Sequence, residues 1–383
     1  RPFVFGRPRP LSWASSACVT WQQLRAALRA NPEVEVVQFD EAVSNGTARS
    51  WEQSRQVEAA DVETVMQNAT IFINYAWNLV PRTVPINEAI VEAFGLPSNT
   101  NLYATEPGLR FDSVPHSDSQ DIFVFQCQGR KHWKVWTPPK LLPTWHQRGK
   151  EGDEFDPDAL GPPILETVLE PYQGMYLPLG FAHTTTTDAA YIDYAGGAGR
   201  GKRSVHLTVG VETLSAGLTM AAFLKCVLFS SGLGHPVIME QFLAFVEHDL
   251  DFRRPLPVGF LGQHGGRQAT AAAGWRPAFI DVVSTEALEL LNRLFDEITA
   301  PEQDPEFRQR LSIEHLKVVA ARHADFYDEY LQGQRQQFRE ARGKGQGQGA
   351  LSGQRHHETT SHRLVRQLEE WCARTSETAG VES

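Results

Sequence analysis

Cysteine is scarce in this chain, with four among 383 residues: Cys18, Cys127, Cys226 and Cys372. No two of them have the CxxC spacing of structural zinc sites and redox motifs. Such scattered cysteines favour a reducing compartment, so we expect an intracellular location in the cytoplasm, the nucleus or an organelle. Because the sequence begins at Arg1 rather than Met, the removal of a targeting segment stays an open alternative.

Long apolar runs and excess positive charge are also missing. The longest apolar run, residues 218–229, contains Lys225 and is shorter than the roughly 20 residues that a membrane helix needs, so it predicts a buried helix. The formal net charge of -10 does not support nucleic acid as a partner. Hydrophobic residues at 41% and charged residues at 21% are typical of globular proteins. We therefore expect a soluble globular protein with no membrane segment.

Short strands dominate the middle of the chain. They include IFVFQCQ (122–128), KHWKVW (131–136), GMYLPLG (174–180) and SVHLTVGVE (204–212). A glycine-containing turn separates the first two runs, which predicts a β-hairpin. Several short strands with turn signals and few helices between them favour an antiparallel barrel or jelly roll.

Helical patterns lie on both sides of these strands. Residues 20–30 form an amphipathic helix ahead of a strand at 33–39, and Pro236 begins a helical segment in the second half. Ser284 is expected to cap a further helix. Two tracts rich in Gly and Gln are expected to be loops or flexible linkers, namely residues 261–275 and 333–357.

The expected fold is mainly β plus α, with a jelly-roll core between an N-terminal α/β segment and a C-terminal helical region. We divide the chain into four parts. They are an α/β segment that packs on the barrel (1–62), the barrel domain (63–213), a helical region (214–300), and C-terminal helices with a flexible linker (301–383).

A histidine followed two residues later by an acidic residue could supply two metal ligands. The sequence holds three such pairs, where about 1.6 are expected at random. They are His116 with Asp118, His323 with Asp325, and His356 with Glu358. Side chains two residues apart share a face of a strand but point apart on a helix. The second pair lies in a helical pattern, where His323 is expected in the core, and the third lies in a Gly/Gln-rich tract. The first pair alone adjoins predicted strands.

A metal site needs a third ligand from another part of the chain. His183 follows a strand and a turn that could aim it into the barrel. His206 competes, because strand alternation places it on one face with Ser204 and Thr208. Two histidines and one carboxylate form the facial triad of non-haem Fe(II) oxygenases, which leaves positions open for a 2-oxo acid and O₂.

Lys131 could bind the second carboxylate of such a 2-oxo acid. Lys131 lies on a predicted strand that follows His116 and Asp118 in the sequence, and strand alternation predicts that His132 faces away from Lys131. The alternative is an exposed strand lysine like Lys134. Spacing alone does not decide between the two.

Four motifs together resemble the JmjC-type cupin domains of Fe(II)- and 2-oxoglutarate-dependent oxygenases, and most closely the ribosomal oxygenase group of protein histidyl and arginyl hydroxylases. The motifs are NLYATEPG (101–108), PHSDSQDIFVFQCQGRKHWKVWTPP (115–139), MYLPLGFAH (175–183) and SVHLTVGVE (204–212). The resemblance covers residues from about 60 to 213 and implies a double-stranded β-helix in which residues 63–213 are the catalytic domain.

The resemblance also implies roles for single residues. His116, Asp118 and His183 would bind Fe(II), and Lys131 would bind the distal carboxylate of 2-oxoglutarate. Tyr103, Ser204 and Asn101 would belong to the cosubstrate site. Between residues 188 and 203 we expect a loop at the barrel mouth, of which Arg200, Lys202 and Arg203 could contact substrate.

We therefore expect an oxygenase that uses O₂ and 2-oxoglutarate to hydroxylate a side chain of a protein, with a ribosomal protein as the candidate substrate, and that releases succinate and CO₂. The alternatives are demethylation of N-methyl-lysine, hydroxylation of RNA or a small molecule, and a non-catalytic cupin-like binding module. The family also suggests a homodimer through residues 214–300.

Overall fold

The structure is a computed structural model that describes most of the chain. The described residues are 1–6, 17–31, 36–40, 43–44, 47–48, 55–58, 60–109, 113–144, 147–149, 155–156, 158–192, 201–214, 216–257, 275–297, 311–346 and 370. The chain divides into two compact units. The barrel unit consists of residues 1–89, 98–211 and 337–357, and the helical unit of residues 90–97, 212–336 and 358–383.

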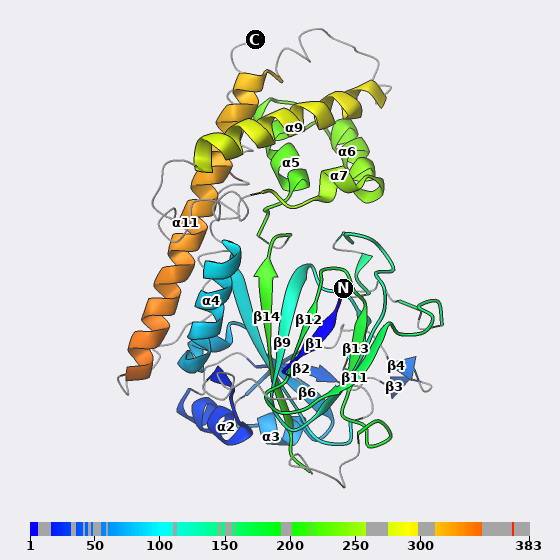
Figure 1. The fold of residues 1–383 in the computed structure, drawn as a ribbon, viewed down its shortest axis with the longest axis vertical. Helices are drawn as coiled ribbons and strands as arrows, with labels where there is room; N and C mark the ends of the chain where they lie inside the picture. Colours follow the sequence, from blue (N-terminus) through cyan, green and yellow to red (C-terminus); the bar gives the residue numbers. More distant parts are fainter. Residues whose placement is uncertain are drawn as a thin grey trace. The chain divides into compact units, whose positions relative to one another are not determined.

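Two antiparallel sheets form the barrel unit (Figure 1). The larger sheet has the strand order β1-β12-β9-β14-β7-β6-β2-β5 and the smaller one β11-β10-β13-β8. The strands of the larger sheet are β1 (Phe3–Phe5), β2 (Val36–Asp40), β5 (Arg55–Val57), β6 (Ala69–Ile73), β7 (Ser98–Thr105), β9 (Gln120–Gln128), β12 (Gly174–Leu177) and β14 (Ser204–Glu212). Those of the smaller sheet are β8 (Ser113–His116), β10 (Lys131–Val135), β11 (Leu165–Leu169) and β13 (His183–Thr186). A short pair, β3 (Val43–Ser44) with β4 (Thr47–Ala48), lies outside both sheets.

The hairpin predicted between residues 122–128 and 131–136 is wrong. β9 pairs with β12 in the larger sheet, whereas β10 pairs with β11 and β13 in the smaller one. The chain passes from the larger to the smaller sheet at Gly129, which has a φ of 66°. Gly129 lies so close to the backbone carbonyl of Arg203 that a side chain would clash there. Consecutive strands that alternate between facing sheets are typical of a jelly roll, so the predicted fold class is confirmed.

The core of the barrel lies between the two sheets. Buried side chains from both sheets meet there: Ile122, Val124, Trp133, Val135, Leu169, Met175 and Leu177. All nine residues of β14 are buried, because this strand lies between β9 and β7 inside the larger sheet. The strand that carries His206 is therefore fixed on both edges by hydrogen-bonded neighbours.

Among the described residues, four α-helices belong wholly or partly to the barrel unit. They are α2 (Trp21–Ala30), α3 (Val62–Val65), α4 (Val84–Phe94) and the last residues of α11 (Ile313–Gln346). α2 confirms the first predicted helix: the side chains of Thr20 and Gln23 form a capping box at its start, and Leu24 and Leu28 are buried.

The helical unit contains α5 (Met220–Ser230), α6 (Pro236–His248), α7 (Leu250–Arg253) and α9 (Trp275–Glu297), with most of α11 (Ile313–Gln346). α6 begins at Pro236, as predicted. No helix in the described part of the chain is long and apolar enough to cross a membrane.

Two predictions for this half of the chain are wrong. Ser284 does not cap a helix, because the buried stripe of α9 already begins at Phe279 and encloses it. Gly333 to Gln346 are helical rather than part of a linker, because Phe338 and Ala341 continue an apolar stripe and the many Gln, Arg and Glu residues favour helix. Residues 261–274 and 347–357 of the predicted linkers lie outside the described residues.

Candidate metal centre

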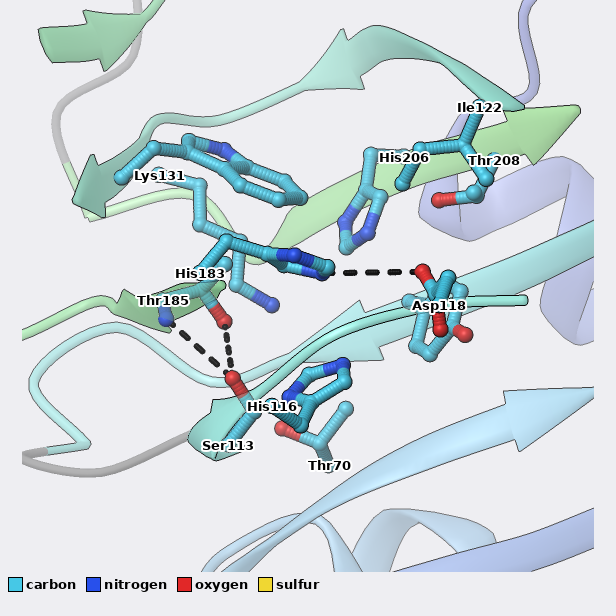
Figure 2. A pocket seen from close by; sticks show the side chains of 12 residues that line it. Thr70, Ser113, His116, Asp118, Ile122, Lys131, His183, Thr185, His206 and Thr208 are labelled. Atoms are coloured by element: carbon cyan, nitrogen blue, oxygen red, sulfur yellow. Dashed lines mark hydrogen bonds and ion pairs between the residues drawn. The ribbon is translucent and has the colours of Figure 1, made fainter. Parts of the chain in front are cut away.

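Three predicted ligands meet at one end of the smaller sheet. His116 ends β8, His183 begins β13, and the two residues are directly paired in the antiparallel ladder. Asp118 follows β8 by two residues. One ligand atom of each lies within 4.8 Å of the others, and His183 Nε2 is 3.6 Å from Asp118 Oδ2 (Figure 2). The group could hold a single metal ion.

Both histidines present the same ring nitrogen. His116 Nδ1 lies 2.8 Å from the carbonyl oxygen of Val114, and His183 Nδ1 lies 3.0 Å from that of Phe181. A carbonyl can only accept, so each Nδ1 carries the proton and each Nε2 keeps its lone pair. Metal-binding histidines are commonly oriented in this way. Both side chains are buried, which excludes bulk water from two sides of the centre.

The two segments that carry the ligands are tied together. The backbone N–H of Gly180 donates to the carbonyl of Asp118 at 3.2 Å. Asp121 Oδ1 accepts from the Tyr176 hydroxyl at 2.7 Å and from the backbone N–H of Leu179 at 3.3 Å. Asp121 thus holds the turn that leads into His183. Sequence reasoning missed it, since the single sign is an acidic residue just ahead of an apolar strand.

Arg148 holds the other ligand segment. Its carbonyl accepts from the backbone N–H of Ser117 at 2.8 Å, and its guanidinium lies 3.4 Å from Ser119 Oγ. The side chain of Arg148 is buried. Both contacts flank Asp118, so Arg148 restricts the turn that presents this carboxylate. No motif marked this residue in the sequence.

Lys131 is buried, in contrast to Lys134 on the same strand. Its ammonium group donates to Thr105 Oγ1 at 3.1 Å, and Thr105 Oγ1 lies 2.9 Å from Thr70 Oγ1. Lys131 is 1% exposed, whereas the side chain of Lys134 is 28% exposed and lies 3.7 Å from Glu166. Lys131 is therefore no exposed strand lysine, and its charge faces the same pocket as the three ligands.

The pocket beside the ligands is walled by rings and hydroxyl groups (Figure 2). Its lining residues are Thr70, Tyr103, Ser113, His116, Asp118, Ile122, Lys131, Trp133, His183, Thr185, His206 and Thr208. Ser113 Oγ and Thr185 Oγ1 are 3.3 Å apart, so hydroxyl groups also adjoin the ligands. The pocket combines a buried cation with several neutral hydrogen-bonding groups.

Tyr103 and His206 stack in this wall. Their ring centroids are 4.7 Å apart with an angle of 2° between the planes. Burial, and then the charge of Asp118, raises the pKa of Tyr103, so its phenol stays protonated and can donate a hydrogen bond. Burial, and then the charge of Lys131, lowers the pKa of His206 well below its usual value, so its imidazole is neutral.

Other predicted residues lie apart from the pocket lining. Asn101 precedes Tyr103 by two residues on β7, and Ser204 Oγ accepts from Gln126 Nε2 at 3.0 Å. Neither residue is among those that line the pocket. Within the expected substrate loop, Arg203 forms an ion pair with Glu106, and Lys202 is exposed. Arg200 lies outside the described residues.

Two other histidines, His132 and His323, are placed as the patterns predict. His132 faces away from the pocket, where its ring stacks on Tyr191 at 4.7 Å and its Nε2 lies 3.0 Å from Glu166. His323 is buried in the helical unit with its ring 5.1 Å from that of Phe223. His356 lies outside the described residues.

Comparison with known families agrees with this architecture. Residues 77–207 match the family model of the JmjC domain. This segment is a JmjC domain. It contains the three candidate ligands, Lys131, and the strands β9 to β13.

Two relatives are similar to part of this chain. Ribosomal oxygenase 1 of Homo sapiens is 31% identical over 192 residues, which cover 50% of this chain and 26% of that protein. The bifunctional lysine-specific demethylase and histidyl-hydroxylase NO66 of Aedes aegypti is 32% identical over 132 residues, which cover 34% of this chain and 19% of that protein. The chain thus spans about a quarter of the length of the ribosomal oxygenases that it matches.

Solved structures are more distant. That of the Escherichia coli ribosomal oxygenase YcfD, in complex with cobalt and 2-oxoglutarate, is 16% identical to this chain. The match covers 82% of this chain and 67% of that chain, with a TM-score of 0.39.

Proposed function

We propose that this chain is an Fe(II)- and 2-oxoglutarate-dependent oxygenase that hydroxylates a side chain of a protein. One observation carries the proposal: His116, Asp118 and His183 converge in the same pocket as the buried ammonium group of Lys131. Two imidazoles and one carboxylate suit Fe(II) and leave one face of an octahedral ion open. A buried cation suits the far carboxylate of a 2-oxo dicarboxylic acid.

The donor atoms fit such an ion. His116 and His183 offer Nε2 because their Nδ1 atoms bond to backbone carbonyls, and Asp118 offers one carboxylate oxygen. Bound there, Fe(II) would supply the activation of O₂ that couples 2-oxoglutarate breakdown to C–H oxidation. One oxygen atom goes to the substrate as a hydroxyl group and the other to succinate, while the carboxyl group of the 2-oxo acid leaves as CO₂.

The surrounding residues would bind and orient the reactants. Lys131 would bind the distal carboxylate, and the protonated phenol of Tyr103 would donate a hydrogen bond in the same pocket. Asn101 and Ser204 would support this wall from β7 and β14. Among the loop cations expected to contact substrate, namely Arg200, Lys202 and Arg203, the exposed Lys202 is the better candidate of the two described ones, since Arg203 is paired with Glu106.

The names of the relatives support a ribosomal protein as substrate. Several of them are ribosomal oxygenases, and others carry the name histidyl-hydroxylase. The same names also include lysine-specific demethylase, so N-methyl-lysine is the second candidate substrate. Hydroxylation of an N-methyl group gives a product that loses formaldehyde, so one site can perform both reactions.

We further propose that residues 63–213 form the catalytic domain and that residues 214–300 mediate a homodimer. Support for the second proposal comes from exposed apolar side chains on α6 and α7, namely Val237, Leu243 and Leu250. Light scattering coupled to size-exclusion chromatography tests it. A monomer at every concentration would contradict it, and so would a dimer that survives replacement of Val237 and Leu243 by aspartate.

The experiment for the main proposal is turnover by the purified chain with Fe(II), O₂ and 2-oxoglutarate. Ribosomal proteins and methyl-lysine peptides serve as substrates, and succinate release and product mass are measured. Gain of one oxygen atom indicates hydroxylation, and loss of a methyl group indicates demethylation. Asp118→Ala and His183→Ala should abolish both signals, while His132→Ala, a buried histidine on the other face, should retain them. Succinate release that persists in the Asp118→Ala variant refutes the proposal.

A further inference from the structure

Asp118 differs from the other two candidate ligands because it lies outside the strands. β8 ends at His116 and β9 begins at Gln120, so the carboxylate belongs to a bridge, residues 117–119, between strands of different sheets. The ladder between β8 and β13 pairs His116 with His183, whereas no pairing among the described strands includes the bridge. The placement of the carboxylate relative to the two imidazoles therefore depends on contacts that other segments make with the bridge.

Arg148 contacts the bridge at both of its ends. Its carbonyl oxygen accepts a hydrogen bond from the backbone N–H of Ser117 at 2.8 Å, and its guanidinium Nη1 donates to Ser119 Oγ at 3.4 Å. Ser117 and Ser119 are the two neighbours of Asp118 in the chain. One residue thus restrains the backbone before the carboxylate and the side chain after it.

Gly149 extends this contact to the residues before the bridge. It has a φ of 69°, and a Cβ atom at this position would lie 2.7 Å from the carbonyl oxygen of Pro115. Pro115 immediately precedes the ligand His116. Because only glycine permits so close an approach, the backbone at Gly149 packs directly against the segment that carries two of the three ligands.

The side chain that makes the contact with Ser119 is itself held in place. Arg148 is 4% exposed, and a guanidinium keeps its charge and offers donors in a rigid plane. A bridge that is already confined loses less conformational freedom when an ion binds. Residues that orient metal ligands in this way change the affinity for the metal although they do not touch the ion.

We propose that Arg148 is a positioning residue of the metal centre, which holds Asp118 where it can share one ion with His116 and His183. The inference rests on the proposed function, in which these three residues bind Fe(II). It assigns part of the metal affinity to the contact between Arg148 and Ser119.

The test is a double-mutant cycle on Mn(II) binding by the full chain, measured by calorimetry. Arg148→Met and Ser119→Ala should each weaken Mn(II) binding by about 10-fold, and the double variant should lose little more, because both changes remove the same contact. Arg148→Lys keeps a cationic donor and should recover part of the loss. Arg130→Met is the matched control. The Arg130 guanidinium pairs with Glu170 at 3.1 Å, at the end of β10 away from His183, so this variant should bind Mn(II) like wild type.

Two further measurements distinguish positioning from a purely structural role. The visible absorption of bound Co(II) reports coordination geometry and should differ between Arg148→Met and wild type, while the melting temperature of the metal-free chain reports folding. A lower melting temperature with unchanged Mn(II) affinity and an unchanged Co(II) spectrum would refute the inference, and so would additive losses in the cycle. If Arg148→Met does not fold, the Mn(II) affinity of Ser119→Ala decides, and an unchanged value refutes the inference. If the wild type does not bind Mn(II), the proposed function itself fails.

Discussion

Replacement of Lys131 by methionine should weaken 2-oxoglutarate binding strongly without weakening metal binding. Lys131 is 1% exposed, and its ammonium group can leave Thr105 for a carboxylate in the same pocket. A hydrogen bond to a charged group contributes about 1.5 to 3 kcal/mol. Since about 1.4 kcal/mol is a factor of ten, the dissociation constant should rise roughly 10-fold to 150-fold. Methionine has a similar length, so the packing around the site is kept.

Calorimetric titration of the Mn(II)-loaded chain measures this change, and the KM for 2-oxoglutarate in succinate release should rise in parallel. Lys134→Met is the matched control, because Lys134 lies on the same strand but faces Glu166 on the outside. It should bind 2-oxoglutarate like wild type. Equal affinities of the Lys131→Met and wild-type proteins would refute the assignment of the distal carboxylate to Lys131. A matching loss of Mn(II) affinity would show instead that the variant disturbs the metal centre.

Three other predictions concern the scaffold of the site and the helical unit. Burial lowers the pKa of His323 to about 3 in the folded chain, so below pH 6.5 the unfolded state takes up the proton first and the free energy of unfolding decreases. Urea unfolding followed by circular dichroism at pH 7.5 and 5.5 should therefore show a loss smaller by roughly 1 kcal/mol in His323→Leu than in wild type, and equal losses would contradict the pKa shift. Tyr176→Phe removes a hydrogen bond to Asp121 and should weaken Mn(II) binding roughly 2-fold to 12-fold in a paramagnetic-resonance titration. Unchanged Mn(II) affinity would show that other contacts hold the turn before His183. Gly129→Ala places a methyl group against the carbonyl oxygen of Arg203 and should lower the melting temperature. Gly161 has a similar φ of 69° with open space around it, so Gly161→Ala should lower the melting temperature less. Equal effects would show that the φ angle alone determines the loss.

Local patterns in the sequence predicted part of the candidate site, whereas the choice of His183 over His206 and the roles of Lys131 and Tyr103 came from the family resemblance. Strand alternation correctly separates Lys131 and Trp133, which line the pocket, from His132, which faces away from it. The same rule separates His116 and Asp118, which lie at and just after the end of β8, from His323 and Asp325, which lie on helix α11. These inferences succeed because the period of a strand or helix is a property of a few neighbouring residues.

Features that depend on distant contacts could not be predicted in this way. The sheet to which β10 belongs is decided by its pairing with β11 and β13, more than 30 residues further on, and not by the short turn at Gly129. The start of α9 at Trp275 depends on the burial of Phe279, and no capping residue in the sequence marks this start. The turn-holding roles of Asp121 and Arg148 likewise arise from contacts with residues 29 to 58 positions away.

The observed strand pairing also shows which sheet supplies each group of pocket residues. His116, His183 and Lys131 come from β8, β13 and β10, which are consecutive neighbours in the smaller sheet, so one hydrogen-bonded ladder fixes the span between the metal ligands and the cation. Tyr103 and His206 come from β7 and β14 of the larger sheet and face that ladder across the core. In the proposed function, the smaller sheet would set the length of a cosubstrate that bridges the metal and Lys131, and Tyr103 of the larger sheet would donate a hydrogen bond to it. Replacement of Tyr103 by phenylalanine should therefore lower 2-oxoglutarate affinity without lowering Mn(II) affinity, whereas replacement of His183 should lower Mn(II) affinity as well.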